Sequence, residues 1–282
     1  MDLRTLLVTV LAMACFAGNS ILCRAALRQT AIDPASFTAI RILSAALATW
    51  VLLRLRGRGP RGGSWGSALA LTAYAAGFAF AYRTLPAGTG ALLLFLAVQA
   101  SMVLWGLGRG ERLGRRQSAG LALALGGLVF LLRPGLAAPP WRAAALMLGA
   151  GAAWGVYSVR GMGSRDPAGA TADNFLRAAP LAALLCLAAP HLRLDPAGCA
   201  YAVLSGALAS GIGYILWYQA IQGLRASAAA SVQLSVPVLT ALAGVALLGE
   251  PLSPRLALAA GAILGGIALV LGTKAAGVSS RC

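Results

Sequence analysis

Apolar residues gather into long runs that short polar segments separate. Ten runs can be marked, at residues 5–23, 35–53, 65–82, 88–108, 117–132, 143–159, 174–189, 198–220, 226–248 and 256–273. Most approach the roughly 20 residues that a helix needs to cross a bilayer, and the shorter ones can extend into their polar flanks. Apolar and polar residues alternate only weakly, and lipid permits only helices or a closed barrel. The pattern predicts an all-α integral membrane protein with ten transmembrane helices.

Composition limits the classes of function. The chain has 282 residues, of which 59% are hydrophobic and 11% charged, whereas soluble domains carry about 45–50% apolar and about 25% charged residues. Ten spans with short connections use the whole length, which leaves no stretch for a soluble catalytic domain. We therefore expect a membrane protein that is not an enzyme.

The basic residues predict an orientation rather than a nucleic-acid partner. The formal net charge is +16, from 23 basic and 7 acidic residues, but the basic residues lie between apolar runs and form no contiguous basic face. An even number of spans puts both termini on one side, and that side holds about twice as many loop Arg and Lys residues as the other. This bias predicts a multi-pass protein of the cell (inner) membrane with both termini in the cytoplasm.

Several kinds of chemistry lack the residues that they need. The five cysteines show no C-x-x-C spacing, and His191 is the single histidine, in a predicted loop. We expect no disulfide, no metal site and no cofactor. The chain also has no Gly-x-x-x-x-Gly-Lys-Ser/Thr phosphate loop, which argues against direct use of ATP.

Two short motifs indicate an internal repeat. Residues 110–113 (Gly-Glu-Arg-Leu) recur as 249–252 (Gly-Glu-Pro-Leu), and 125–128 (Leu-Gly-Gly-Leu) recur as 264–267 (Leu-Gly-Gly-Ile). Each half then holds five helices, and because five is odd the second half enters the membrane from the opposite side. The repeat predicts a first five-helix unit at 1–135, a second, inverted unit at 140–275 and a short tail at 276–282. Inverted repeats are common in secondary transporters, whose solute site lies near the midplane between the halves.

Three stretches carry a resemblance to a known family. They are Ser235 to Thr240 running into Gly249-Glu250, Asp33-Pro34 through Phe37 to Arg41, and Trp154 to Tyr157. With them the chain resembles the drug/metabolite transporter superfamily, specifically its EamA-type ten-helix members. One departure is Val98-Gln99, where members often carry the proline matched here by Pro237.

The resemblance implies a basket of ten helices around a central cavity, with helices five and ten at the periphery. It also implies a secondary transporter that exports amino acids or other small metabolites, and the aromatic content looks like that of YddG-type amino-acid exporters. The partners are then a small solute and the lipid bilayer, and the oligomeric state is left open, a monomer included. Drug export is an alternative, as are two other classes, a non-transporting scaffold and a lipid-modifying enzyme.

The marked spans hold no Asp or Glu, and proton-coupled carriers commonly use an intramembrane carboxylate or histidine as relay. This favours an uncoupled facilitator or exchanger over a proton antiporter, with coupling through Arg41 or water as the alternative. Arg41 itself either snorkels to a headgroup or pairs with Asp33, or it attracts anions at the mouth of the cavity.

Aromatic and amide side chains are the candidates for solute contact. Tyr74 and Trp154 lie roughly 13–20 Å from their helix starts at 1.5 Å per residue, inside the hydrocarbon rather than in the interfacial belt. Aromatic rings offer stacking and apolar contact, and amides offer donors and an acceptor. The predicted cavity residues are Asn19, Tyr74, Phe78, Gln99, Trp154, Tyr157, Tyr214 and Gln233.

Two further sets of residues are predicted to move during transport, as gates and as hinges. Tyr82 falls near the outer end of its helix and Tyr218 near the inner end, so these residues and Trp217 are the candidate gates. Proline kinks a helix and glycine loosens it. The candidate hinges are Pro180, Gly211, Gly213 and Pro237.

Overall fold

The computed structural model describes residues 3–108, 114–133, 138–161, 164–222 and 232–271. Over these residues the chain forms ten helical rods, one of them composed of three segments. The first half holds α1 (Leu3–Gln29), α2 (Pro34–Leu55), α3 (Trp65–Tyr82), α4 (Ala87–Gly108) and α5 (Arg115–Leu132). The second half holds α6 (Trp141–Gly161), α7 (Pro167–Ala188), the rod α8 (Pro196–Val203), η1 (Leu204–Ile212) and α9 (Gly213–Gln222), then α11 (Ser235–Leu248) and α12 (Pro254–Leu271).

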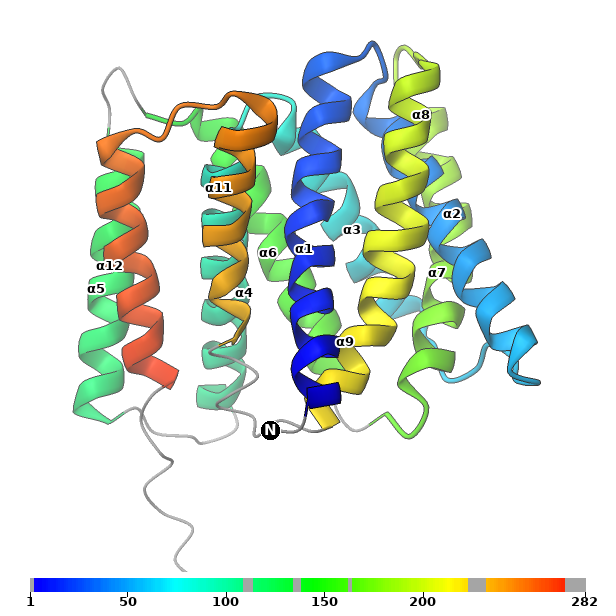
Figure 1. Ribbon diagram of the computed structural model, residues 1–282, viewed down its shortest axis with the longest axis horizontal. Coiled ribbons are helices and arrows are strands. Elements are labelled where there is room, and N and C mark those ends of the chain that lie inside the picture. Colours follow the sequence, from blue (N-terminus) through cyan, green and yellow to red (C-terminus); the bar gives the residue numbers. More distant parts are fainter. Residues whose placement is uncertain (1–2, 109–113, 134–137, 162–163, 223–231, 272–282) are drawn as a thin grey trace, which may run out of the picture.

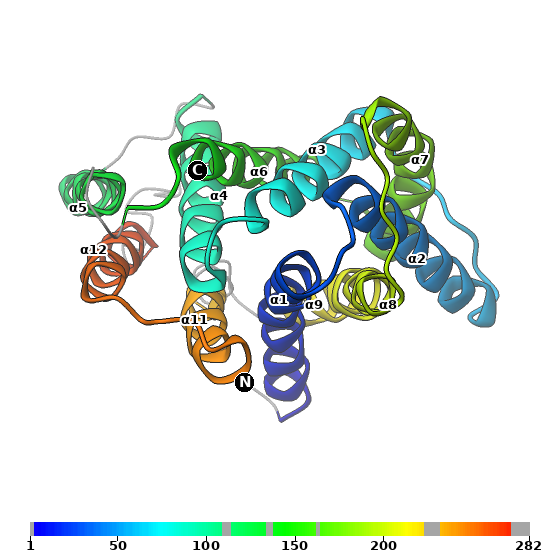
Figure 2. The same cartoon turned by 90° about the horizontal axis from the view of Figure 1, so that it is seen from above.

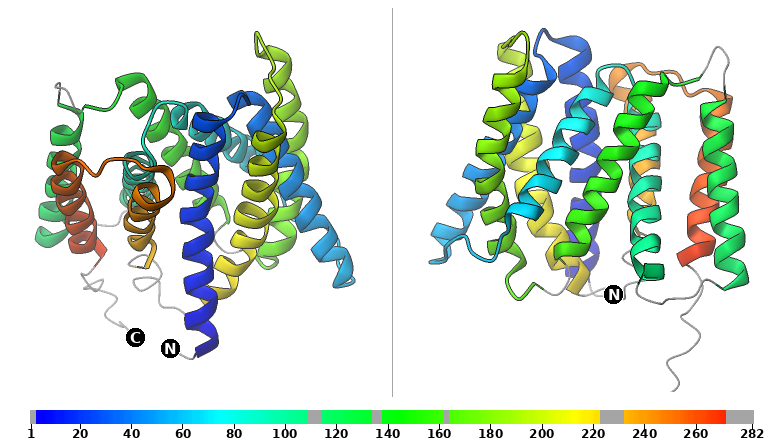
Figure 3. Two further views of the ribbon diagram at one scale, coloured as in Figure 1. Left: turned by 45° about the horizontal axis from the view of Figure 1, so that its top comes forward. Right: turned by 180° about the vertical axis from the view of Figure 1, so that it is seen from behind.

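The rods run up and down between two faces of the molecule (Figure 1). The N-terminal face is the one at which α1 begins, and the far face is the one at which α1 ends. Because successive rods alternate in direction, α6 begins at the far face whereas α1 begins at the N-terminal face (Figures 1 and 3). The two halves therefore start from opposite faces.

Three Asp-Pro pairs begin helices in the same way. At 33–34, 166–167 and 195–196 the aspartate caps the helix by accepting backbone N–H groups, and the proline occupies the first turn. The predicted start of the seventh helix at Asn174 was therefore wrong, because the cap at Asp166 starts α7 seven residues earlier. Polar residues in its first turns hid this start. Of the predicted helix at 226–248, residues 226–231 lie outside the described residues.

Among the described residues, four helices are long and apolar enough to cross a bilayer, at Thr5–Gln29, Pro34–Leu55, Ala87–Gly108 and Pro196–Trp217. Two shorter apolar helices lie at Ser235–Leu248 and Pro254–Val270. Large apolar side chains cover the outer surface of the bundle, such as Leu47 at 62% exposure, Val129 at 69% and Leu187 at 83%. A surface of this kind suits a lipid environment.

Seen from above, neighbouring helices lie side by side, with α5 and α12 at one end of the molecule and α2 and α7 at the other (Figure 2). Helix α2 packs on α7, α4 on both α6 and α11, and α3 on α6, while α1 packs on the rod α8–η1–α9 and on α11. Helix α5 packs mainly against α12, and this pair stands apart from the other helices. Gly120 and Gly266 let the two backbones approach, since a Cβ at either would collide with the other helix.

The rod between α8 and α9 contains a π-helix, η1. Helices with i→i+5 hydrogen bonds are rare and frequently occur at functional sites. A Cβ at Gly206 would collide with Ser44 Oγ and the carbonyl oxygen of Arg41, so only glycine lets η1 lie this close to α2. A Cβ at Gly213, the first residue of α9, would collide with Cys15 on α1, whereas a Cβ at Gly211 would lie 3.3 Å from Thr49 Cγ2, a tight contact but not a collision.

The candidate hinges lie at distinct places in the helices. Pro180 is inside α7, and Pro237 is the third residue of α11. Proline is tolerated in the first turn of a helix, where a donor is not needed. Gly211 and Gly213 serve close packing in this conformation. Movement at these four positions stays a prediction.

The contact at Gly206 gives a test of the π-helix packing. We expect Gly206→Ala to lower the free energy of unfolding by about 1–3 kcal/mol, because the added methyl group overpacks the contact between η1 and α2. The measurement is the thermal melting of purified protein in detergent. Gly265→Ala on α12 is the matched control, since a Cβ there meets nothing within 4 Å. Equal melting of the two variants would contradict the close approach.

Candidate solute-binding site

Three polar side chains from α1, α3 and η1 meet inside the bundle. Ser205 Oγ donates to Asn19 Oδ1 at 2.7 Å, and Asn19 Nδ2 donates to Tyr74 Oη at 3.2 Å. All three residues are buried. Buried amides and hydroxyls need such partners because an unpaired polar group in low dielectric is costly. The predicted cavity residues Asn19 and Tyr74 are thus brought together, and Ser205 joins them.

Arg41 extends this network from α2. Its Nε donates to Ser210 Oγ at 3.2 Å, and its Nη2 donates to Tyr74 Oη at 3.1 Å. The residue is only 2% exposed, so Arg41 does not snorkel to a headgroup. Asp33 is engaged elsewhere, capping α2 and accepting the backbone N–H of Arg193. The guanidinium therefore belongs to the interior of the bundle.

The π-helix places both serines of this network. Ser205 and Ser210 are five residues apart, one hydrogen-bond step of η1, so they lie on the same side and face Asn19 and Arg41 respectively. Neither serine was predicted to be a site residue. The signal available in the sequence was the cluster of Gly206, Gly211 and Gly213, which marks close backbone approach but does not distinguish a π-helix from an α-helix.

Aromatic rings surround the polar network. Trp154 on α6 lies 4.9 Å from the ring of Tyr74, 5.3 Å from that of Tyr157 and 4.8 Å from that of Tyr214, between ring centroids. Tyr74 also lies 5.4 Å from Phe78. These five predicted cavity residues form one cluster contributed by α3, α6 and α9. Edge and offset contacts at such distances are favourable and preserve a defined arrangement.

Further rings extend the cluster toward α1 and α7. Phe16 lies 6.0 Å from Tyr214 and 5.9 Å from Trp217, and Phe175 stacks on Tyr214 at 5.9 Å. Trp217, a predicted gate, is half-buried at this edge of the cluster. The other predicted gate of this helix, Tyr218, has a side chain that lies outside the described residues.

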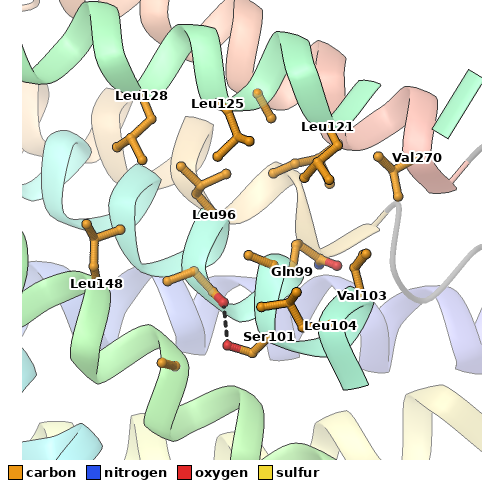
Figure 4. Close-up of a pocket in the computed structure, with 15 residues that line it drawn as sticks. Leu96, Gln99, Ser101, Val103, Leu104, Leu121, Leu125, Leu128, Leu148 and Val270 are labelled. Carbon is orange, nitrogen blue, oxygen red and sulfur yellow. Dashed lines mark hydrogen bonds between the residues drawn. The ribbon is translucent and has the colours of Figure 1, made fainter. Parts of the chain in front are cut away.

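Gln99 and Gln233 do not join the network of Asn19 and Arg41 in this conformation. Gln99 lines a cavity of about 270 Å³ between α4, α5, α6 and α12, none of whose lining residues belongs to that network. Figure 4 shows Gln99 and Ser101 there among leucine side chains, with Ser101 Oγ bonded to the carbonyl oxygen of Ala97. Gln233 is half-buried, two residues before the start of α11. Asn19, Gln99 and Gln233 were predicted to line one cavity, but in this conformation they lie at separate places.

A buried ion pair lies toward the far face. Arg24 Nε lies 2.8 Å from Glu250 Oε1, with the two side chains 9% and 5% exposed. Arg24 Nη1 also donates to the carbonyl oxygens of Tyr82 and Arg83, at 2.8 and 3.1 Å. Glu250 Oε2 accepts the backbone N–H of Ala87 at 2.6 Å. These bonds tie together α1, the α3–α4 loop and the α11–α12 loop.

The second Gly-Glu motif owes its form to this contact. Gly249 ends α11 with a positive φ of 62°, a conformation that glycine adopts without strain. The turn directs Glu250 back into the protein, where its backbone N–H donates to the carbonyl oxygen of Gly244. Tyr82, the predicted outer gate, is fully buried beneath this contact and donates its hydroxyl to the carbonyl oxygen of Ala87. The first motif, at 110–113, lies outside the described residues.

Aspartate caps connect the two halves at both faces. Asp33 at the start of α2 accepts from the loop before α8, and Asp166 at the start of α7 pairs with Arg58 and Arg61 at 2.8 and 3.1 Å. Partial burial would raise the pKa of Asp166, but the Gly169 N–H and the two arginines outweigh it and hold the pKa below its ordinary value. Both ends of the α2–α7 pair are thus anchored by carboxylates.

The expectation of spans without acidic residues needs one correction. Because α7 begins at Pro167, Asp173 falls inside it. Its carboxylate is already engaged, pairing with Arg177 at 3.0 Å and accepting the N–H of Gly63 at 2.9 Å. Arg177, which a shift of 136 residues in the predicted repeat aligns with Arg41, also stacks over the ring of Trp65 at 5.6 Å. It therefore sits near the N-terminal face and has a different environment from Arg41.

Known proteins share this helical arrangement and sequence. The model of the EamA-like transporter family matches residues 3–133 and 141–272. The chain belongs to the EamA-like transporter family. It is therefore a multi-pass membrane transporter and not an enzyme, and its partners are a small solute and the lipid bilayer.

Individual relatives extend over almost the whole EamA chain. A protein of Pseudomonas aeruginosa named "Uncharacterized protein PA1977" is 61% identical over 276 residues, which cover 97% of this chain and 96% of that protein. An "Uncharacterized transporter" of Archaeoglobus fulgidus is 28% identical over 261 residues, with coverage of 86% and 88%. A solved crystal structure aligns with a TM-score of 0.66 at 22% identity, over 93% of this chain and 97% of that one. That likeness concerns the fold alone.

The buried pair at the far face of this EamA protein can be tested through its two arginines. Arg24→Ala leaves Glu250 buried without its main partner, and we expect a loss of about 3–5 kcal/mol in the free energy of unfolding. Arg28 also approaches Glu250, at 3.6 Å, but is 45% exposed, so Arg28→Ala should cost less than about 1 kcal/mol. Thermal melting in detergent measures both. Similar losses for the two variants would show that burial does not set the strength of this contact.

Proposed function

We propose that this EamA transporter exports small metabolites from the cytoplasm by alternating access without ATP hydrolysis, with amino acids, aromatic ones included, as its main solutes. The observation that carries the proposal is the cluster of Asn19, Arg41, Tyr74, Trp154 and Tyr214 inside the bundle. It combines charged, amide and aromatic groups. These are the groups that a carboxylate, an amino group and an apolar side chain need.

The proposal includes two inverted five-helix repeats, residues 1–135 and 140–275, followed by a tail at 276–282. Helix packing supports it. Exchanging the halves relates α2 to α7, α4 to α11 and α5 to α12, and each of these pairs is in contact. The same exchange relates the contact of α3 with α6 to that of the rod α8–η1–α9 with α1. Solute sites of such carriers lie between the repeats, as the cluster does.

Alternating access requires that the two faces open in turn. We assign the described conformation to a state closed at the far face, because Arg24, Glu250 and Tyr82 join three segments there. With both termini in the cytoplasm, as the loop charges favour, the far face is the outer one. Release of solute to the outside then requires the Arg24–Glu250 contact to part, with Tyr82 as the gate beneath it and Trp217 and Tyr218 as gates toward the cytoplasm.

The transport step is proposed to be uncoupled from protons, as a facilitator or an exchanger. The carboxylates that the structure describes near the helices are already engaged, Asp173 with Arg177 and Glu250 with Arg24. Proton relays in membrane carriers commonly use an intramembrane carboxylate that changes its protonation in each cycle. In this protein the engaged carboxylates serve instead to join helices.

Transport by purified protein in liposomes tests the proposal. We expect phenylalanine to pass down its gradient without ATP or an imposed proton gradient. Trp154→Ala and Tyr214→Ala should lower the initial rate at least about tenfold, because each removes several ring contacts worth about 0.5–1.5 kcal/mol apiece. Trp65→Ala should stay within about twofold, since Trp65 is 57% exposed and lies outside the cluster.

Matched controls separate function from packing. All variants are compared at equal incorporation into liposomes and with their melting temperatures measured, and Trp154→Phe keeps an aromatic ring in place. If Trp65→Ala, Trp154→Ala and Tyr214→Ala lower the initial transport rate equally, the assigned cluster is contradicted. Strict dependence of downhill flux on a proton gradient would contradict uncoupled transport and direct attention to Glu250.

Orientation is tested by labelling introduced cysteines in a variant without the native ones. Gly59→Cys lies in the α2–α3 loop, where a side chain meets nothing within 4 Å, and Leu194→Cys lies in the α7–α8 loop, where the native side chain is 70% exposed. An impermeant thiol reagent applied to intact cells should label position 194 and spare position 59. The reverse pattern would invert the proposed topology, and labelling of both would contradict the number of crossings between them.

A further inference from the structure

We propose that Arg41 binds the carboxylate of the transported solute, so that the solute class of this carrier is organic carboxylates. The inference rests on the proposed transport function and names the group that the site recognises. It starts from the partners of the Arg41 guanidinium. Nε and Nη2 donate to Ser210 and Tyr74, while Nη1 is buried and has no hydrogen-bond partner among the described residues.

The charge of Arg41 is also unneutralised. The ion pairs within the described part of the chain involve Arg24, Arg28, Arg58, Arg61 and Arg177, each with a carboxylate. The contacts of the Arg41 guanidinium among the described residues are with uncharged groups. They include the rings of Tyr74 and Phe78, whose centroids lie 5.1 and 5.0 Å from the guanidinium carbon. Ring faces attract a cation but do not replace a counter-ion. A buried charge without a counter-ion is strongly unfavourable, and within a membrane it marks a functional site.

A second buried donor belongs to the same cluster as this guanidinium. The hydroxyl of Tyr214 is buried and has no hydrogen-bond partner among the described residues. The Tyr214 ring contacts that of Trp154, which in turn contacts Tyr74, a hydrogen-bond partner of Arg41. Buried hydroxyls normally find a partner. The site therefore offers two buried groups that can donate, the charged Nη1 of Arg41 and the Tyr214 hydroxyl, which can also accept.

A carboxylate fits both requirements. Its two oxygens accept hydrogen bonds from a guanidinium and a hydroxyl at once, and its charge neutralises that of Arg41. Trp154, which contacts both Tyr74 and Tyr214, then lines the place where the rest of the solute lies. No described carboxylate approaches Arg41 to receive an ammonium group in its stead. An amine or a primary amide of otherwise equal shape should accordingly be rejected.

The rigid surroundings of Arg41 make the assignment specific to this residue. Gly206 of η1 fits against the Arg41 carbonyl oxygen, and Ser210 of the same π-helix holds Nε. Tyr74 holds Nη2 and is itself held by Asn19. Since two of its nitrogens are fixed in this way, the third has a defined direction, and the guanidinium is preorganised for one ligand.

Binding of matched solute pairs to detergent-purified protein tests the inference. The probes are phenylalanine and leucine, their primary amides, and the deaminated acids 3-phenylpropionate and 4-methylpentanoate. Wild-type protein should bind each acid at least about tenfold more tightly than the corresponding amide, whether or not the acid carries an amino group. Arg41→Gln should reduce this acid-to-amide ratio to about one, with Arg41→Lys between the two.

The ratio is the decisive readout because a purely structural role would weaken acid and amide alike. Tyr214→Phe keeps the ring, removes only the hydroxyl and should lower the ratio severalfold, so it tests the site even where Arg41→Gln does not fold. Arg177→Gln, at the repeat counterpart, is the matched control and should leave the ratio unchanged. An undiminished ratio in Arg41→Lys and Tyr214→Phe would overturn the inference.

Failure of the inference and failure of the transport function give different results. If wild-type protein in liposomes transports the amides as well as the acids, the carboxylate site is contradicted and the carrier function stands. If it transports none of the probes, the proposed solute class is contradicted as a whole, and the carboxylate site with it.

Discussion

A guanidinium group that is buried among uncharged side chains needs hydrogen-bond acceptors and aromatic rings from the neighbouring helices. Arg41 is such a group in the middle of the bundle. Helix α3 supplies the Tyr74 hydroxyl and the Phe78 ring, and η1 supplies Ser210. The π-helix lies close enough to α2 to do so only because position 206 is glycine. Tyr74 then fixes Asn19, and Asn19 fixes Ser205. The polar interior thus depends on one charge, and the aromatic cluster packs around it.

The far-face contact shows the other way in which this fold accommodates a buried arginine. Arg24 has a carboxylate partner and two carbonyl oxygens, so its charge is neutralised and its donors are used. Breaking such a pair exposes or strands both charges, which makes it a strong contact while closed and a costly one to open. A carrier can tolerate that cost if solute binding offsets it. These two buried arginines therefore have different roles: Arg24 joins helices, and Arg41 retains a donor without a partner.

Sequence patterns predicted most of the fold and only part of the site. Helix α3 begins and ends at the predicted residues, because an apolar run bounded by polar loops leaves little freedom. The start of α7 was missed, since the polar residues up to Asp173 read as a loop although a cap at Asp166 precedes them. Periodicity found the aromatic residues of the cluster. It did not find the Arg24–Glu250 pair, because the two residues are 226 positions apart and a contact over that separation leaves no local pattern. It did not find η1 either, because a change from α-helix to π-helix does not alter the local apolar pattern.

The unneutralised charge also bears on how the carrier turns over. When solute is absent, Arg41 stays in a low-dielectric interior with an unused donor, and any conformation that excludes water from both faces leaves it so. When a carboxylate is bound, that penalty is removed before the faces exchange. The loaded carrier therefore crosses the closed state more readily than the empty one, and each outward step is most easily followed by return with another carboxylate. On the proposed binding of a carboxylate, a buried arginine without a counter-ion thus favours exchange over net flux.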